Sequence, residues 1–226
     1  AIGTTNTVDN NRTFVHKQSE RKGKIMPRPR TLSDEHLLDL VLTLIHAEGP
    51  ETATFAAVSK ASGLSGSTLV QRFSTKAAML RQALLHAWDQ LDAETAQLCE
   101  TLPRTPQGAV ALLAALSGNY GDSAAVYADG LRLLREDFRD PQLRARGAAW
   151  GRTLVGAISA CFINANRPQV TARLMLAQWQ GSLLWWGFEA DGPVVPYVES
   201  QLQDFLAELG NSSSPSPVIA GQQDFA

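Results

Sequence analysis

The chain has 226 residues, of which 44% are hydrophobic and 19% are charged, and its formal net charge is −2. This composition is typical of a globular protein with a hydrophobic core and excludes a disordered chain. No apolar run reaches the roughly 18 residues of a membrane span. The two cysteines, Cys99 and Cys161, match no metal-binding or disulfide motif, so we expect two reduced, at least partly buried thiols in a cytoplasmic protein.

The first 30 residues are polar and locally basic. Between Arg12 and Arg30 the sequence holds seven basic residues and one acidic residue. A flexible basic arm ahead of a DNA-binding unit can follow the phosphate backbone or enter the minor groove. We expect residues 1–30 to form such an arm. If Met26 is the natural start, residues 1–25 are either foreign to the natural chain or an unusual leader.

Helical periodicity recurs through the rest of the chain, whereas strand signals are almost absent. Proline, glycine and N-cap residues divide the chain into nine predicted helices. With their caps, these cover about residues 33–48, 54–62, 65–73, 75–98, 107–118, 122–138, 140–165, 167–188 and 192–209. The sequence therefore predicts an all-α fold.

Residues 54–73 have the layout of a helix-turn-helix, in which the second helix enters the DNA major groove. Gly63 separates two short predicted helices, and the second begins with small polar residues. Short hydroxyl side chains let the backbone approach DNA, and Gln71 can bind adenine through two hydrogen bonds. The predicted DNA-binding residues are Thr54, Ser65, Ser67, Thr68, Gln71, Arg72 and Lys76. Ser65 and Thr68 also have a purely structural interpretation, as a helix cap and a packing residue.

The residues around this turn resemble the signature of TetR-family repressors. The matching residues are Gly63-Leu64-Ser65, Thr68-Leu69, Phe73, Lys76 and Met79-Leu80, within residues 33–88. Val70 departs from the pattern, because the family commonly has a tyrosine there that touches the DNA backbone. Gly66 stands where a basic residue is frequent, and Ala77 replaces an acidic residue.

The resemblance implies a homodimer that binds a palindromic operator and releases it when a small, mostly apolar effector binds. We expect a helix-turn-helix domain at 31–80 and a ligand-binding and dimerisation bundle at 81–210, with the boundary in the long fourth predicted helix. The Ser/Pro-rich composition after residue 210 predicts a disordered tail at 211–226. The implied effector-binding residues are Trp88, Tyr120, Tyr127, Phe138, Trp150 and Leu154. The implied dimer interface contains Gly181, Leu184, Trp185, Val198, Leu202, Phe205 and Leu206. The apolar stripes that hold these residues can also simply complete a core.

Two other functions stay open. One is a helical ligand-binding or protein-interaction module that has lost DNA binding, which Val70 and Gly66 favour. The other is an enzyme, which is the weakest hypothesis. The sequence has no Gly-x-Ser-x-Gly, Walker, Gly-x-Gly-x-x-Gly or zinc-pair motif. We therefore expect no catalysis, no metal and no cofactor.

Overall fold

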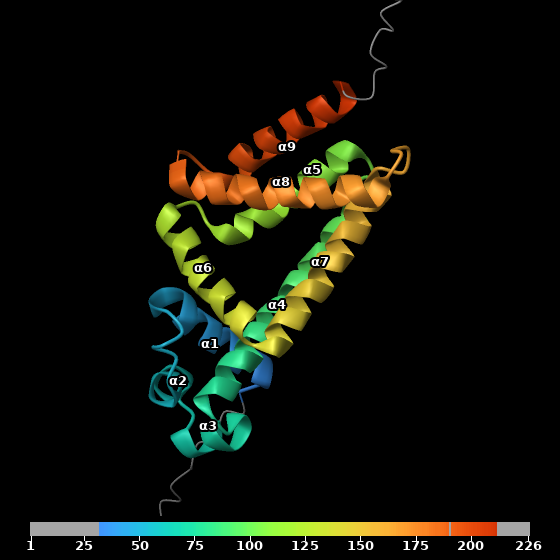
Figure 1. The fold of residues 1–226 in the computed structure, drawn as a ribbon. Coiled ribbons are helices and arrows are strands. Elements are labelled where there is room, and N and C mark those ends of the chain that lie inside the picture. Colours follow the sequence, from blue (N-terminus) through green and yellow to red (C-terminus); the bar gives the residue numbers. More distant parts are fainter. Residues whose placement is uncertain (1–31, 190, 212–226) are drawn as a thin grey trace, which may run out of the picture. The chain divides into compact units, whose positions relative to one another are not determined.

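The computed structural model describes residues 32–189 and 191–211, excluding the side chain of residue 211 (Figure 1). The predicted basic arm and the tail from residue 212 onward lie outside these residues. The described part contains nine α-helices and no strand, which confirms the predicted all-α fold. The helices are α1 Asp34–Glu48, α2 Phe55–Ser62, α3 Gly66–Phe73, α4 Lys76–Thr101, α5 Pro106–Ser117, α6 Ala124–Arg139, α7 Pro141–Cys161, α8 Pro168–Glu189 and α9 Val194–Asn211. A short 3₁₀ helix at Gly118–Tyr120, which the sequence did not predict, follows α5. None of the described helices is long and apolar enough to cross a membrane.

Side-chain caps determine where α1 to α7 begin. Each of these helices follows a Ser, Thr or Asp whose side chain accepts a hydrogen bond from a backbone N–H of the first turn. Such a cap satisfies one of the four N–H groups that a helix leaves without a partner. The predicted caps Ser33, Thr54, Ser65 and Thr75 are confirmed.

Two helix ends differ from the prediction by three residues or more. α4 continues past Leu98 to Thr101 and stops at Leu102, whose backbone is extended. The proline that follows Leu102 disfavours the helical conformation at this position. α7 ends at Cys161 rather than near residue 165, because the backbone tightens into a turn closed by a hydrogen bond from the Ala165 N–H to the Phe162 carbonyl.

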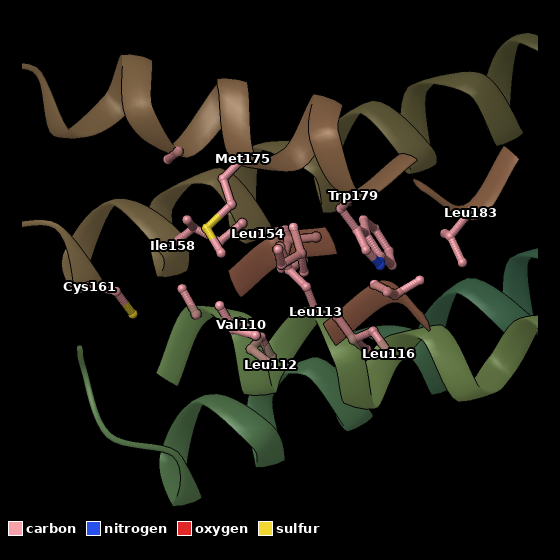
Figure 2. Close-up of a cluster of buried hydrophobic side chains, with 14 of the residues drawn as sticks. Val110, Leu112, Leu113, Leu116, Leu154, Ile158, Cys161, Met175, Trp179 and Leu183 are labelled. Carbon is pink, nitrogen blue, oxygen red and sulfur yellow. The ribbon is translucent and has the colours of Figure 1, made fainter. Parts of the chain in front are cut away.

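Two hydrophobic clusters hold the helices together. The first joins α1, α2, α3 and α4 through fully buried side chains such as Leu37, Leu69 and Met79. The second joins α5, α7, α8 and α9, and Trp179 and Trp186 are almost completely buried in it. Figure 2 shows side chains of α5, α7 and α8 converging in this second cluster.

α4 contributes to both clusters. Its first turns pack in the first cluster, and the side chain of Trp88 packs against both. α4 and α7 lie side by side (Figure 1). Charged side chains join them: Arg146 of α7 bonds Asp89 at 2.9 Å and Asp92 at 2.5 Å. Arg81 of α4 bonds Asp140, the cap of α7, at 2.5 Å. α4 is therefore a continuous element from the first cluster to the second.

Candidate nucleic-acid interface and cavity

The turn between α2 and α3 depends on a left-handed glycine. Gly63 has φ of +72°, a conformation that glycine adopts without steric cost. The Ser59 hydroxyl donates to the Leu64 carbonyl at 2.6 Å, which ties the turn back to α2. Beyond the turn, Leu69 and Phe73 are buried against the first cluster. The opposite face of α3 is consequently turned to solvent.

This exposed face of α3 carries hydroxyl and amide groups. The Ser65 hydroxyl accepts a hydrogen bond from the Thr68 N–H at 3.2 Å, and it lies 2.8 Å from the hydroxyls of both Ser67 and Thr68. The exposed Gln71 side chain forms no hydrogen bond with any described residue. Ser67 and Gln71 are four residues apart and so share one face of the helix. The structure thus brings Ser65, the cap of α3, together with Ser67, Thr68 and Gln71 of this helix. Thr54, by contrast, is half-buried and caps α2.

The two predicted cations of this surface have partners within the chain. Arg72, whose side chain is 24% exposed, donates to the Leu32 carbonyl and to Asp34, both at 2.9 Å. The Lys76 ammonium donates to the Glu51 carbonyl at 2.6 Å. These contacts connect α3 to the start of α1, and α4 to the loop after α1. In the free protein both cations therefore support the helix-turn-helix.

The predicted DNA-binding domain, residues 31–80, does not carry a net positive charge. Residues 31–80 contain three basic and five acidic side chains, a net charge of −2. Lys60 is exposed and forms no ion pair with any residue that the structure describes. Positive charge is concentrated instead in the sequence between Arg12 and Arg30, where the excess of basic residues is six.

A cavity of about 610 Å³ that is open to solvent lies between α4, the turn that follows it, α5 and α7. Its wall is mostly small or apolar and includes Ala96, Leu112 and Ala157. Cys99 of α4 and Cys161 of α7 both line it, and both are free thiols, half-buried and buried respectively. Burial raises the pKa of each thiol, so both are neutral at pH 7. The predicted burial of these cysteines is confirmed.

One polar residue connects this wall to the aromatic core. Thr95 is 1% exposed, and its hydroxyl accepts a hydrogen bond from the indole N–H of Trp150 at 3.0 Å. The same hydroxyl donates to the Leu91 carbonyl at 2.7 Å. The ring of Trp150 packs against those of Trp88 and Trp179, with centroids 5.7 and 6.3 Å away. The hydrogen bond from Trp150 to Thr95 thereby joins the cavity wall to the packed core.

No protein-family model and no curated protein sequence matches the chain. Solved structures match it by their fold. A transcriptional regulator from Rhodococcus sp. Rha1 has a TM-score of 0.65 and 22% identity, over 82% of this chain and 100% of that chain. A proposed regulator from Saccharomonospora viridis, in complex with choline, has a TM-score of 0.60 and 18% identity over 76% and 93% of the two chains. FadR from Bacillus subtilis, in complex with stearoyl-CoA, has a TM-score of 0.55 and 12% identity over 74% and 94%.

Other matching structures are TetR-family transcriptional regulators, including one from Streptomyces coelicolor A3. The chain has a TetR-like fold. The helix-turn-helix that the sequence predicted is the N-terminal part of this TetR-like fold, and α4 leads from it into the remaining helices.

The predicted dimer residues separate into surface and core within the TetR-like fold. Leu184 and Trp185 of α8 are 45% and 61% exposed, and Gly181 of the same helix is partly exposed. Val198 and Leu202 of α9 are fully buried by the chain's own helices, which corrects their prediction as interface residues. Both point into the core because α9 packs on α5 and α8. Phe205 and Leu206 are half-buried.

The predicted effector-binding residues are not brought together at the cavity. Trp88, Tyr120, Tyr127, Trp150 and Leu154 belong to or pack against the second cluster, and Phe138 is 61% exposed on α6. None of the six lines the cavity. The cavity instead forms where small residues of α4 and α7, such as Ala96, Gly156 and Ala160, leave space between the helices. The spacing of these small residues along the two helices is the feature of the sequence that could have indicated the cavity.

Proposed function

We propose that the chain is a ligand-responsive, sequence-specific DNA-binding repressor that acts as a homodimer and leaves its operator when a small molecule binds. The observation that carries this proposal is the path of α4. Met79 and Ala83 of α4 are buried in the cluster that supports α3, while Thr95 and Cys99 of the same helix line the cavity. We keep residues 31–80 and 81–210 as the proposed division between DNA binding and effector binding.

The effector would act through α4. A dimer must present its two recognition helices about 34–36 Å apart to reach successive major grooves, so a small tilt of each α4 is enough to lose the operator. A ligand shifts this equilibrium only by its difference in affinity for the two states. The ion pairs of Arg146 with Asp89 and Asp92 link α4 to α7 beside the cavity, and they are the contacts that such a tilt would change.

The proposed dimer surface is the exposed face of α8. Leu174, Gly181, Leu184, Trp185 and Phe188 lie within four turns on one side of this helix, and Trp185 and Phe188 pack on each other with ring centroids 5.7 Å apart. Phe188 is 74% exposed and Leu174 is 53% exposed. Exposed apolar patches with large aromatic residues favour protein interfaces. Phe205 and Leu206 of α9 are proposed to flank this surface.

The proposed readers of DNA lie on α3. Ser67 and Gln71 contact base edges, with Ser65 and Thr68 beside them, whereas Thr54, Arg72 and Lys76 contact phosphates. Arg72 and Lys76 do so by exchanging their partners within the chain for phosphate oxygens. A palindromic operator follows from the two-fold symmetry of the dimer.

Selection from a random duplex pool, followed by fluorescence anisotropy at several salt concentrations, tests this proposal. The wild-type chain should bind a palindrome with an affinity that falls with salt. Gln71→Ala should relax the preference at one or two base pairs, and Lys76→Ala should lower the salt slope by about one unit. Gln97→Ala, which removes an exposed glutamine of α4 away from α3, is the matched control. Absence of salt-sensitive, sequence-preferring binding by the wild-type chain would refute the proposal.

A helical ligand-binding module without DNA binding is the second candidate. The net charge of −2 for residues 31–80 and the engaged side chains of Arg72 and Lys76 favour it. Ligand binding by the full chain, with no DNA affinity even at about 50 mM salt, would select this candidate over the first.

A further inference from the structure

We propose that the cavity between α4, α5 and α7 binds an amphiphilic carboxylate, with its aliphatic part on the apolar wall and its carboxylate on the Arg104 guanidinium. This inference rests on the proposed effector role of the cavity and names the chemical class of the effector. It follows from Arg104, the one charged lining residue that bonds no described residue.

Arg104 lies in the turn between α4 and α5 and lines the cavity. Its exposed side chain forms neither a hydrogen bond nor an ion pair with any residue that the structure describes. By contrast, Arg72, Arg81 and Arg146 each bond a carboxylate. The positive charge of Arg104 also acts on the Cys99 thiol inside the cavity. Its planar fork of N–H groups matches the two oxygens of a carboxylate.

Hydrogen bonds order the backbone of the turn that carries Arg104. The Thr105 N–H donates to the Pro103 carbonyl at 2.9 Å, and the Thr105 hydroxyl accepts from the Gly108 N–H at 3.1 Å. A Cβ atom at Gly108 would lie 1.8 Å from the Pro103 carbonyl oxygen, so only glycine allows the turn to press this closely on α5. A backbone that is ordered in advance lowers the entropy cost of binding.

The other polar groups at the cavity are already satisfied. The carboxylate of Asp92 is 2.5 Å from the guanidinium of Arg146, which it shares with Asp89, so Asp92 already has a bonded partner. The Thr95 hydroxyl is fully bonded. The neutral thiols add no negative charge that would repel a carboxylate. Arg104 is therefore the one charged lining residue without a hydrogen bond or ion pair to a described residue, which favours an anion beside it.

The rest of the site suits an aliphatic chain. Ala96, Leu112, Ala157 and Ala160 supply apolar wall on three helical elements. The cavity volume of about 610 Å³ lies within the range of about 300–1,000 Å³ that is usual for small-molecule sites. A free fatty acid and an N-acyl amino acid both offer this combination of a tail and a carboxylate.

Calorimetry on the full chain without DNA tests this inference with three probes that each have a ten-carbon chain: decanoate, decanol and decyltrimethylammonium. Decanoate should bind at least tenfold more tightly than the other two. Arg104→Gln should weaken decanoate about ten- to a hundredfold, as expected for a lost charged hydrogen bond, and leave decanol unchanged. Arg104→Lys should retain part of the affinity. Arg135→Gln, which removes an exposed arginine of α6 that pairs with no described residue, should change nothing.

Occupancy has a second readout in the alkylation of Cys99, which bound decanoate should slow in the wild-type chain and not in Arg104→Gln. Equal binding of the three probes, or an Arg104→Gln variant with wild-type affinity for decanoate, would overturn the proposed ligand class. Decanoate affinity and operator affinity are measured separately. If operator binding is found but decanoate binding is not, the carboxylate ligand is rejected and the repressor function is retained. If decanoate binding is found but operator binding is not, the repressor function is rejected and the anion site is retained.

Discussion

Thr95→Val isolates the hydrogen bond between the cavity wall and the aromatic core. Valine has nearly the shape of threonine, so the substitution leaves no cavity and removes only the hydroxyl. Trp150 is 7% exposed, and its indole N–H then keeps no partner. A buried donor without a partner costs about 1–3 kcal/mol. Loss of the bond to the Leu91 carbonyl adds little, because that carbonyl lies within α4 and keeps its helical partner.

Guanidinium denaturation followed by circular dichroism measures this cost, provided that the slopes of the two transitions agree. The free energy of unfolding should fall by about 1–3 kcal/mol. In a chain of this size each kcal/mol lowers Tm by about 2–4 °C. Thr153→Val is the control. Thr153 lines the same cavity, but it is exposed and its hydroxyl contacts only the Ala149 carbonyl at 3.4 Å. Its substitution should stay within about 0.5 kcal/mol of wild type.

A double-mutant cycle identifies the partner. In a Trp150→Phe background the donor is absent, so Thr95→Val should then cost less than about 0.5 kcal/mol. An equal cost of Thr95→Val in both backgrounds, or a cost equal to that of Thr153→Val, would refute the assignment of this hydrogen bond as the stabilising contact.

Three further predictions concern the helices and their contacts. Ser65→Ala removes the cap of α3, so it should lower the free energy of unfolding by about 1 kcal/mol and weaken operator binding, as denaturation and anisotropy would show. Gly108→Ala should lower the free energy of unfolding by about 1–3 kcal/mol in the same denaturation assay, because the new methyl clashes with the preceding turn. Gly151→Ala is its control and should be neutral or stabilising, because open space surrounds the new methyl. The hydrogen bond from His86 lowers the pKa of Asp39 in the folded chain. The ionised carboxylate therefore stabilises the fold above about pH 4, which is the pKa of Asp39 in the unfolded chain. This stabilisation is lost as pH falls through the lower pKa of the folded state. Tm measured from pH 3 to 7 should therefore fall more steeply at the acid end for wild type than for Asp39→Asn, and parallel curves would contradict the assignment.

The sequence predicted the start of α3 correctly because a cap is a local interaction. The Ser65 hydroxyl and the Thr68 N–H that it accepts are three residues apart. The hydrogen-bond partners of Arg72 and Lys76 could not be predicted from the sequence, because Asp34 and Glu51 lie 38 and 25 residues away from them. The sequence around a basic residue near a predicted recognition helix looks the same whether its side chain binds a phosphate or bonds a neighbouring segment of the protein.

The C-terminal half shows the same limit for apolar residues. Periodicity placed Leu184 and Val198 on apolar stripes alike, yet one is exposed on α8 and the other is fully buried under α9. A stripe indicates which side of a helix is apolar and contains no information on which helix will cover it. The size of a side chain was an equally poor guide to the ligand-binding residues. The large aromatic residues fill the core, and the cavity forms beside small residues.

The sequence by itself determined the helices, their caps and the helix-turn-helix with Gly63 at its turn, since all of these depend on residues within a few positions of one another. Only the tertiary structure decided the position of the cavity, the two engaged cations and the unpaired Arg104 at the cavity. These depend on how α4, α5 and α7 pack, and such packing joins residues that are far apart in the chain and interchangeable in a sequence pattern.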